Sequence, residues 1–269
     1  MDAPEEDSPR AAFALLSWRV NLTLIVGLIA LSVLAWRSTI QDATSMRGMV
    51  MGLGQIGWLA QGDMSGGAFL AMWVTMMAAM MLPTIAPMAL AHLGVNRRRG
   101  RGIYPTLVFI AGYLLVWSTI GLVPLLAYKA LAPLSEDAVL LRWLPALAGG
   151  ILIVAGAYQF TRWKRVCFEH CQSPFAFVAS HDFDGGALSA LRAGVIHGMI
   201  CLGCCWALTA VLLVVGLMNL LWMAGIFAIF VIEKTSKRGL AVARVAGIGL
   251  IALGIAVFTR PALLAVIAL

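Results

Sequence analysis

Long stretches of this chain lack charged residues, and this feature most narrows the folds open to it. Residues 193–232, for example, contain no Asp, Glu, Lys or Arg. A run of about 20 apolar residues can cross the roughly 30 Å hydrocarbon core of a bilayer as a helix. Charged residues make up only 12% of the chain, against about 25% in soluble domains. The chain is therefore predicted to be an integral membrane protein.

Seven apolar runs, separated by polar or basic segments, predict an all-α polytopic transmembrane helical bundle of about seven spans. The predicted spans are residues 20–36, 68–91, 104–131, 143–161, 188–216, 218–232 and 240–258. They divide the chain into four parts. These are an N-terminal tail over 1–19, an anchor helix and loop over 20–67, a bundle with Cys and His motifs over 68–258, and a C-terminal tail over 259–269.

Basic residues gather in alternate loops. Groups of Arg and Lys lie at 97–101, 162–165 and 234–238. The positive-inside rule places such loops in the cytoplasm. We therefore predict the inner membrane of a bacterium, with the N-terminus cytoplasmic. The same bias explains the net charge of +7, so the predicted partner is the lipid bilayer and not a nucleic acid.

Three of the five cysteines and one of the four histidines lie together in residues 197–206. On a helix that turns about 100° per residue, they fall within an arc of roughly 100°. They are His197, Cys201, Cys204 and Cys205. Thiolates and imidazoles are the ligands that zinc prefers, and thiolates and thioethers suit Cu(I). This face of the predicted span is therefore a candidate site for a soft metal ion.

The other two cysteines, Cys167 and Cys171, are four residues apart in a polar insertion over 166–187. We expect this insertion to be a cytoplasmic loop, whose cysteines would admit the ion or complete its coordination. A four-coordinate site would draw on His197, Cys201, either Cys204 or Cys205, and either Cys167 or Cys171. His92, His170 and His181 are expected to be interfacial or loop residues and not ligands.

Methionines form two rows at helical spacing in the second predicted span. Met72, Met76 and Met80 make one row, and Met77 and Met81 make the other. A methionine stripe usually packs a core, but a ladder of thioethers also suits Cu(I). The five methionines are therefore candidate secondary contacts for a metal.

Several motifs resemble a bacterial domain-of-unknown-function family described as predicted metal-binding integral membrane proteins. The resemblance covers about residues 68–258. The motifs that carry it are residues 72–83, Gly112-Tyr113-Leu114, residues 164–171 with Ser173-Pro174, residues 197–206, residues 219–223 and Glu233-Lys234. The resemblance implies a multi-span membrane protein with a metal site, and it implies no particular reaction.

The favoured hypothesis is a membrane protein that binds a soft metal ion, copper before zinc, for handling or sensing it. Metal-handling proteins would then be its partners. Two alternatives stay open. One is a thiol-redox protein that exchanges disulfides between the two cysteine groups, although the cytoplasm disfavours stable disulfides. The other is a non-catalytic accessory subunit of a membrane complex. No motif identifies catalytic residues.

Overall fold

A computed structural model describes residues 7–45, 65–131, 138–174, 177 and 186–267. All of its regular elements in these ranges are helices. The helices are α1 (Asp7–Ser45), α3 (Gly66–Arg98), α4 (Tyr104–Ile120), α5 (Leu122–Leu131), α6 (Ala138–Tyr158), α7 (Arg162–Gln172), α9 (Gly186–Val215), α10 (Leu220–Thr235), α11 (Gly239–Thr259) and α12 (Ala262–Ile267). The predicted all-helical architecture is confirmed.

Within the described residues, five helical segments are long and apolar enough to cross a membrane, or six if a bent pair is counted as one span. The five are Trp18–Ser45, Gly66–Arg98, Tyr104–Ala130, Gly186–Val215 and Gly239–Thr259. The bent pair joins Arg142–Tyr158 to Arg162–Gln172 at 60°. The protein is thus a multi-pass membrane protein, with fewer candidate spans than the seven expected.

The difference in span number comes mainly from α10. This helix has 16 residues and is therefore about 24 Å long, short of a roughly 30 Å hydrocarbon core. The predicted anchor over 20–36 corresponds to a much longer helix, α1. The rest of the predicted loop before the second span, residues 46–64, lies outside the described residues. The cytoplasmic N-terminus stays a prediction.

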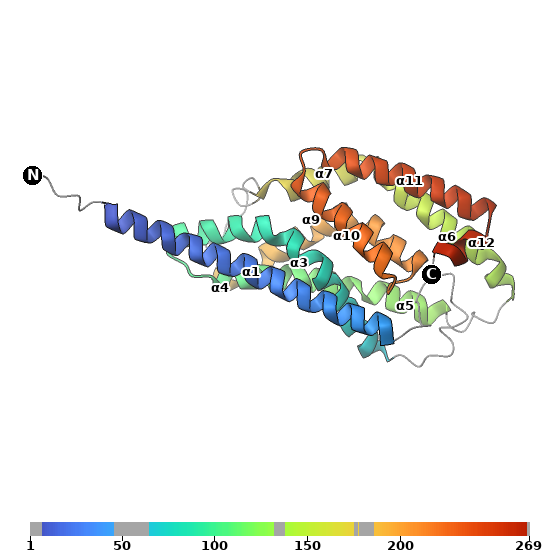
Figure 1. Cartoon of the computed structure of the whole chain (residues 1–269), viewed down its shortest axis with the longest axis horizontal. Coiled ribbons are helices and arrows are strands. Elements are labelled where there is room, and N and C mark those ends of the chain that lie inside the picture. Colours follow the sequence, from blue (N-terminus) through green and yellow to red (C-terminus); the bar gives the residue numbers. More distant parts are fainter. Residues whose placement is uncertain (1–6, 46–64, 132–137, 175–176, 178–185, 268–269) are drawn as a thin grey trace, which may run out of the picture.

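The helices pack as neighbouring pairs, with α1 beside α3 along one side of the bundle and α6 beside α11 along another (Figure 1). The first turns of α1 project beyond the other helices (Figure 1). Close approach of α6 and α11 depends on facing glycines, because a Cβ on Gly156 would lie 2.6 Å from the Gly247 carbonyl oxygen. Small residues allow such contacts in membrane bundles.

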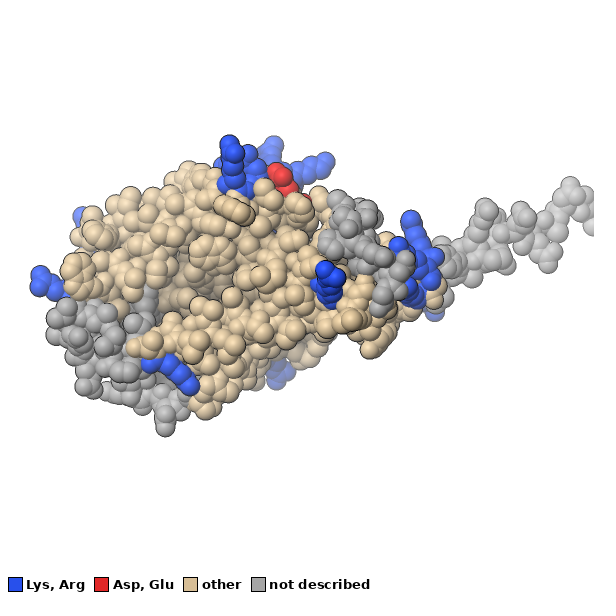
Figure 2. All heavy atoms as spheres, turned by 180° about the vertical axis from the view of Figure 1, so that it is seen from behind, with Lys and Arg blue, Asp and Glu red and all other residues tan. Residues whose placement is uncertain are grey.

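The outer surface has the character expected for contact with lipid. On the face in Figure 2, Lys and Arg side chains form a few groups, most of them near the edges, and a wide surface without Lys, Arg, Asp or Glu lies between them. Exposed large apolar residues occur on α1, α4, α6 and α11, for example Val33, Leu115, Val154 and Val245. In water such a surface would favour aggregation, whereas in a bilayer it faces acyl chains.

Candidate metal centre

Helix α9 forms the centre of the bundle and carries the first cysteine group. Cys201 lies near the middle of this 30-residue helix, and Cys201, Cys204 and Cys205 are each at most 1% exposed. Helix α4 packs directly against α9 at Gly194, where an added Cβ would collide with the Phe109 carbonyl oxygen. This close contact fixes α4 against the part of α9 that precedes the buried thiols.

Cys167 and Cys171 lie on a helix and not in a loop, which corrects the sequence-based expectation. Helix α7 begins after Thr161, whose side chain accepts a hydrogen bond from the Lys164 backbone N–H. This cap favours a new helix start, and α7 leaves the direction of α6 by 60°. The bend turns α7 back against α9. A polar segment therefore returns into the bundle with two thiols on it.

Buried polar contacts hold α7 in place. The Lys164 Nζ atom lies 2.8 Å from Glu233 Oε2 on α10 and donates to the Cys204 carbonyl oxygen at 2.6 Å. Lys164 and Glu233 are 0% and 1% exposed. At the other end of α7, Gln172 Nε2 donates to the Glu233 carbonyl oxygen at 2.6 Å and to the Ser236 carbonyl oxygen at 3.0 Å. Helices α7, α9 and α10 are thus joined around the cysteines.

Three thiols from two helices form a compact group. The Sγ atoms of Cys171, Cys201 and Cys204 all lie within 4.8 Å of one another. Cys171 Sγ is 3.6 Å from Cys204 Sγ. Cys205 extends the group, because its Sγ atom lies 3.3 Å from Cys204 Sγ. All five cysteines are free thiols.

A lysine and a tyrosine contact the Cys201 thiol from the neighbouring helices. Lys234 Nζ donates to Cys201 Sγ at 3.1 Å and to Thr84 Oγ1 at 3.0 Å. The Tyr113 hydroxyl lies 3.2 Å from the same sulfur. A cation and a hydroxyl at these distances stabilise a thiolate. Cys201 therefore lies where a deprotonated, metal-binding sulfur is favoured.

Helix α7 closes the group on one side and leaves Cys167 outside it. The Cys167 Sγ atom lies against α9 at Gly203, only 2.7 Å from where a Cβ on that residue would lie. Within the described part of the chain, Cys167 does not belong to the group of thiols close enough to share one ion. It is one helical turn before Cys171, which does belong.

The sequence comparison adds a family to this geometry. A family model described as PpoB2, copper chaperone, matches residues 70–257, more than two thirds of the chain. The chain belongs to this copper chaperone family. The match covers nearly the same region as the resemblance to metal-binding membrane proteins, and it specifies copper. Comparisons with curated proteins and with solved structures find no match.

The sequence motifs of the resemblance all lie within the region matched by the copper chaperone family. They contain two residues of the thiol site that were not among the predicted ligands. Lys234 and Tyr113 both contact Cys201, although the sequence marks them only as parts of these motifs. No sequence pattern marks Thr84, which accepts a hydrogen bond from Lys234. The sequence does offer one signal for Lys234, which is a charged residue at the end of an apolar run.

In this member of the copper chaperone family, His197 lies outside the thiol group. Its ring lies among aromatic rings, with centroids 5.7 Å from Tyr113, 5.9 Å from Phe109 and 5.3 Å from Phe177. Its Nδ1 atom is buried and has no hydrogen-bond partner among the described residues. The structure therefore does not bring His197 into the close cysteine group. The residue lines a cavity of about 40 Å³ beside it, together with Cys171, Met88 and Lys234.

The methionine rows are part of the buried core. Met72, Met76, Met77, Met80 and Met81 are each at most 5% exposed. Met81 is connected to the cysteine group by Thr84, whose hydroxyl lies 3.9 Å from Met81 Sδ and accepts the hydrogen bond from Lys234. The other four methionines pack in the same hydrophobic core as Cys201, Cys204 and Cys205.

Neither His92 nor His170 belongs to the thiol group. His170 is exposed, and its ring bonds to the Val166 carbonyl oxygen. His181 lies outside the described residues. His92 was expected at the interface but is 1% exposed, and its Nδ1 atom lies 3.0 Å from Thr106 Oγ1. The polar contact explains this burial, because a buried imidazole is tolerated when it is hydrogen-bonded.

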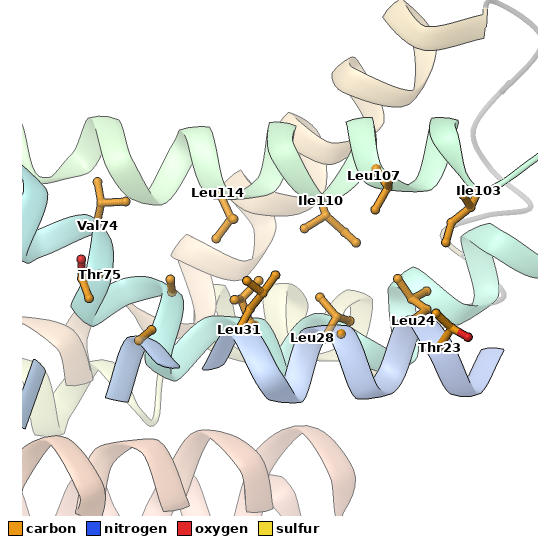
Figure 3. A pocket seen from close by; sticks show the side chains of 14 residues that line it. Thr23, Leu24, Leu28, Leu31, Val74, Thr75, Ile103, Leu107, Ile110 and Leu114 are labelled. Atoms are coloured by element: carbon orange, nitrogen blue, oxygen red, sulfur yellow. The ribbon is translucent and has the colours of Figure 1, made fainter. Parts of the chain in front are cut away.

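A larger cavity of about 550 Å³ opens between α1, α3 and α4 (Figure 3). Its walls are apolar side chains such as Leu28, Ile110 and Leu114, and its polar groups include the hydroxyls of Thr23 and Thr75. No sulfur or imidazole is among the residues that line it. The soft-ligand chemistry of the described residues is therefore concentrated at the thiol group and its small adjoining cavity.

Proposed function

We propose that this protein binds one Cu(I) ion through the thiolates of Cys171, Cys201 and Cys204 and holds it as cargo for a copper-receiving protein. The observation that carries the proposal is the convergence of three thiols from α7 and α9 within 4.8 Å, in a chain of a copper chaperone family. Thiolates are the protein ligands that best select Cu(I).

The spacing of the sulfurs suits one small ion. Three thiolates around one ion, with metal–sulfur bonds of about 2.3 Å, place neighbouring sulfurs roughly 4 Å apart in a trigonal site. The 3.6 Å between Cys171 and Cys204 is close to this separation. When Cu(I) binds, each ligating thiol releases its proton to bulk water and its sulfur forms a bond to copper. The ammonium of Lys234 offsets part of the negative charge that develops.

The remaining sequence-predicted ligands take supporting roles in this proposal. Cys205 is placed to exchange with Cys204, because their sulfurs are 3.3 Å apart. Cys167 would meet the ion one turn before Cys171 on α7. His197 borders the cavity beside Cys171 and would offer an imidazole during release. Met81 is a secondary contact through Thr84, and Met72, Met76, Met77 and Met80 act as packing.

We place the protein in the inner membrane of a bacterium with its N-terminus in the cytoplasm. The distribution of basic residues supports this orientation. A chaperone for copper requires a protein that supplies the ion and one that receives it. Exchange between thiolate sites passes the ion without releasing it free, since each new sulfur binds before an old one leaves.

The test is Cu(I) binding by detergent-purified, reduced protein in competition with a colorimetric Cu(I) chelator. The double variant Cys201→Ser/Cys204→Ser should lose copper retention while it stays folded and inserted in the membrane. Cys167→Ser is the matched control and should retain copper. A folded double variant that still holds copper would contradict the assignment of these ligands.

The same preparation distinguishes the alternative functions. A thiol-redox protein would lose free thiols on oxidation without metal and recover them only with a reductant. An accessory subunit would hold no copper, keep five free thiols and purify with a partner. A Cu(I) carrier recovers its thiols when a chelator removes the copper.

A further inference from the structure

Lys234 is the cation closest to the proposed copper ligands. Its Nζ atom lies 3.1 Å from Cys201 Sγ, and the Thr84 hydroxyl accepts its second hydrogen bond at 3.0 Å. Its side chain also lines the small cavity beside Cys171 and His197. An ion bound to Cys201 at about 2.3 Å would therefore lie within roughly 5 Å of this ammonium.

The other charges in this region compensate one another. Lys164 and Glu233 form an ion pair at 2.8 Å, buried between α7 and α10. In the described parts of the chain, no carboxylate lies within salt-bridge distance of Lys234. Lys234 therefore presents a positive charge to the cysteine group and forms no ion pair with a described carboxylate.

This charge affects ions differently according to their valence. A monovalent ion at the thiolates is repelled by the ammonium once, and a divalent ion at the same point is repelled twice as strongly. The thiolates attract both ions, but the extra repulsion falls only on the divalent ion. At about 5 Å and an effective dielectric constant of about 20, one added unit of charge changes an equilibrium constant on the order of a hundredfold.

We propose that Lys234 is a specificity-determining residue that favours monovalent over divalent soft ions at the Cys171–Cys201–Cys204 site. The inference rests on the proposed function and adds the means by which the site distinguishes Cu(I) from Zn(II). Lys234 does not bind the ion. It acts by its fixed charge next to Cys201, held in position by Thr84.

The experiment measures the dissociation constants of metal ions in two pairs. The members of each pair differ in charge but have the same electron configuration. Cu(I) is compared with Zn(II), and Ag(I) with Cd(II), each by competition with a chelator in reduced, detergent-purified full-length protein. The variants are Lys234→Met and Lys234→Gln, which remove the charge, and Lys234→Arg, which keeps it. Lys237→Met is the matched control, because Lys237 is exposed three residues further along the chain.

In the wild type, Cu(I) should bind more tightly than Zn(II). The ratio of the Zn(II) to the Cu(I) dissociation constant should fall on the order of a hundredfold in either neutral variant, as Coulomb's law requires for one unit of charge. The Ag(I) and Cd(II) pair should shift in the same direction and by a similar factor. Lys234→Arg and Lys237→Met should leave both ratios near the wild-type values.

Unchanged ratios in a folded neutral variant would overturn the proposal, and so would an equal shift in Lys237→Met. Wild-type protein that retains Zn(II) in preference to Cu(I), when both are offered at the same concentration, would overturn it whatever the variants do. Failure of the proposed function is a separate result, in which the wild type binds no Cu(I). If the wild type binds Cu(I) but the ratios of dissociation constants do not depend on Lys234, only this inference is rejected.

Discussion

The Sγ atom of Cys171 on α7 lies 3.6 Å from the Sγ atom of Cys204 on α9, although the two residues are 33 positions apart in the chain. The contact exists because the chain bends by 60° between α6 and α7, and α7 then packs on α9. The metal centre therefore depends on the position of α7 as much as on the cysteines of α9.

Changing Cys171 to Ser should weaken Cu(I) binding, because it removes the only thiol of the close group that α7 supplies. We expect a loss greater than about tenfold, since even substitutions outside the ligand shell cost metal sites about 10–100-fold. The measurement is chelator competition. Cys167→Ser on the same helix should have a smaller effect, and equal losses in the two variants would contradict the ligand assignment.

Breaking the buried ion pair between α7 and α10 should destabilise the protein. Lys164→Met leaves the Glu233 carboxylate buried without its partner, and such a change costs about 3–5 kcal/mol. The measurement is thermal unfolding in detergent. The double variant Lys164→Met/Glu233→Met should recover much of the loss, because no charge is then left unpaired. A double variant as unstable as the single one would argue against this origin of the loss.

Gly203→Ala should separate α7 from α9. The added Cβ would lie 2.7 Å from Cys167 Sγ, and overpacking of this kind costs about 1–3 kcal/mol. Cys167→Ala in the same chain should restore stability and copper binding, because it removes the sulfur that collides. Gly225→Ala is the control, since a Cβ there meets no atom within 4 Å. No rescue by Cys167→Ala would show that another contact is responsible.

Copper should stabilise the folded protein reversibly. A ligand present at about 1,000 times its dissociation constant adds about 4 kcal/mol to the free energy of unfolding. The melting temperature should rise on loading with Cu(I) and return when a chelator removes it, with five free thiols then titratable. A requirement for a reductant to recover the thiols would instead indicate disulfides.

Much of the fold follows from the sequence because lipid restricts what apolar runs can form. The runs around residues 193–216 and 240–258 contain so few charges that only helices satisfy their backbones in a bilayer. The span number could not be derived in the same way. Residues 218–232 look like a span by composition, but the helix there ends at Thr235 with Glu233 buried inside the protein.

Part of the thiol site could also be predicted from the sequence. Periodicity placed Cys201, Cys204 and Cys205 together because they share one helix, and all three are buried. The role of Cys171 within the group depends on the bend between α6 and α7, which the sequence marks only by the Thr161 cap. Lys234 is visible in the sequence as a charge at the end of an apolar run, but its contact with Cys201, 33 positions away, is not encoded locally. Tertiary packing alone brings these residues together.

The central claim is that one Cu(I) ion is held by sulfur from both α7 and α9. X-ray absorption at the copper edge, on reduced protein loaded with Cu(I), tests it most directly. The account predicts a monovalent copper ion with three sulfur neighbours, reduced to two in Cys171→Ser and unchanged in Cys167→Ser. Copper coordinated mainly by nitrogen or oxygen, or a sulfur count that Cys171→Ser leaves unchanged, would contradict it.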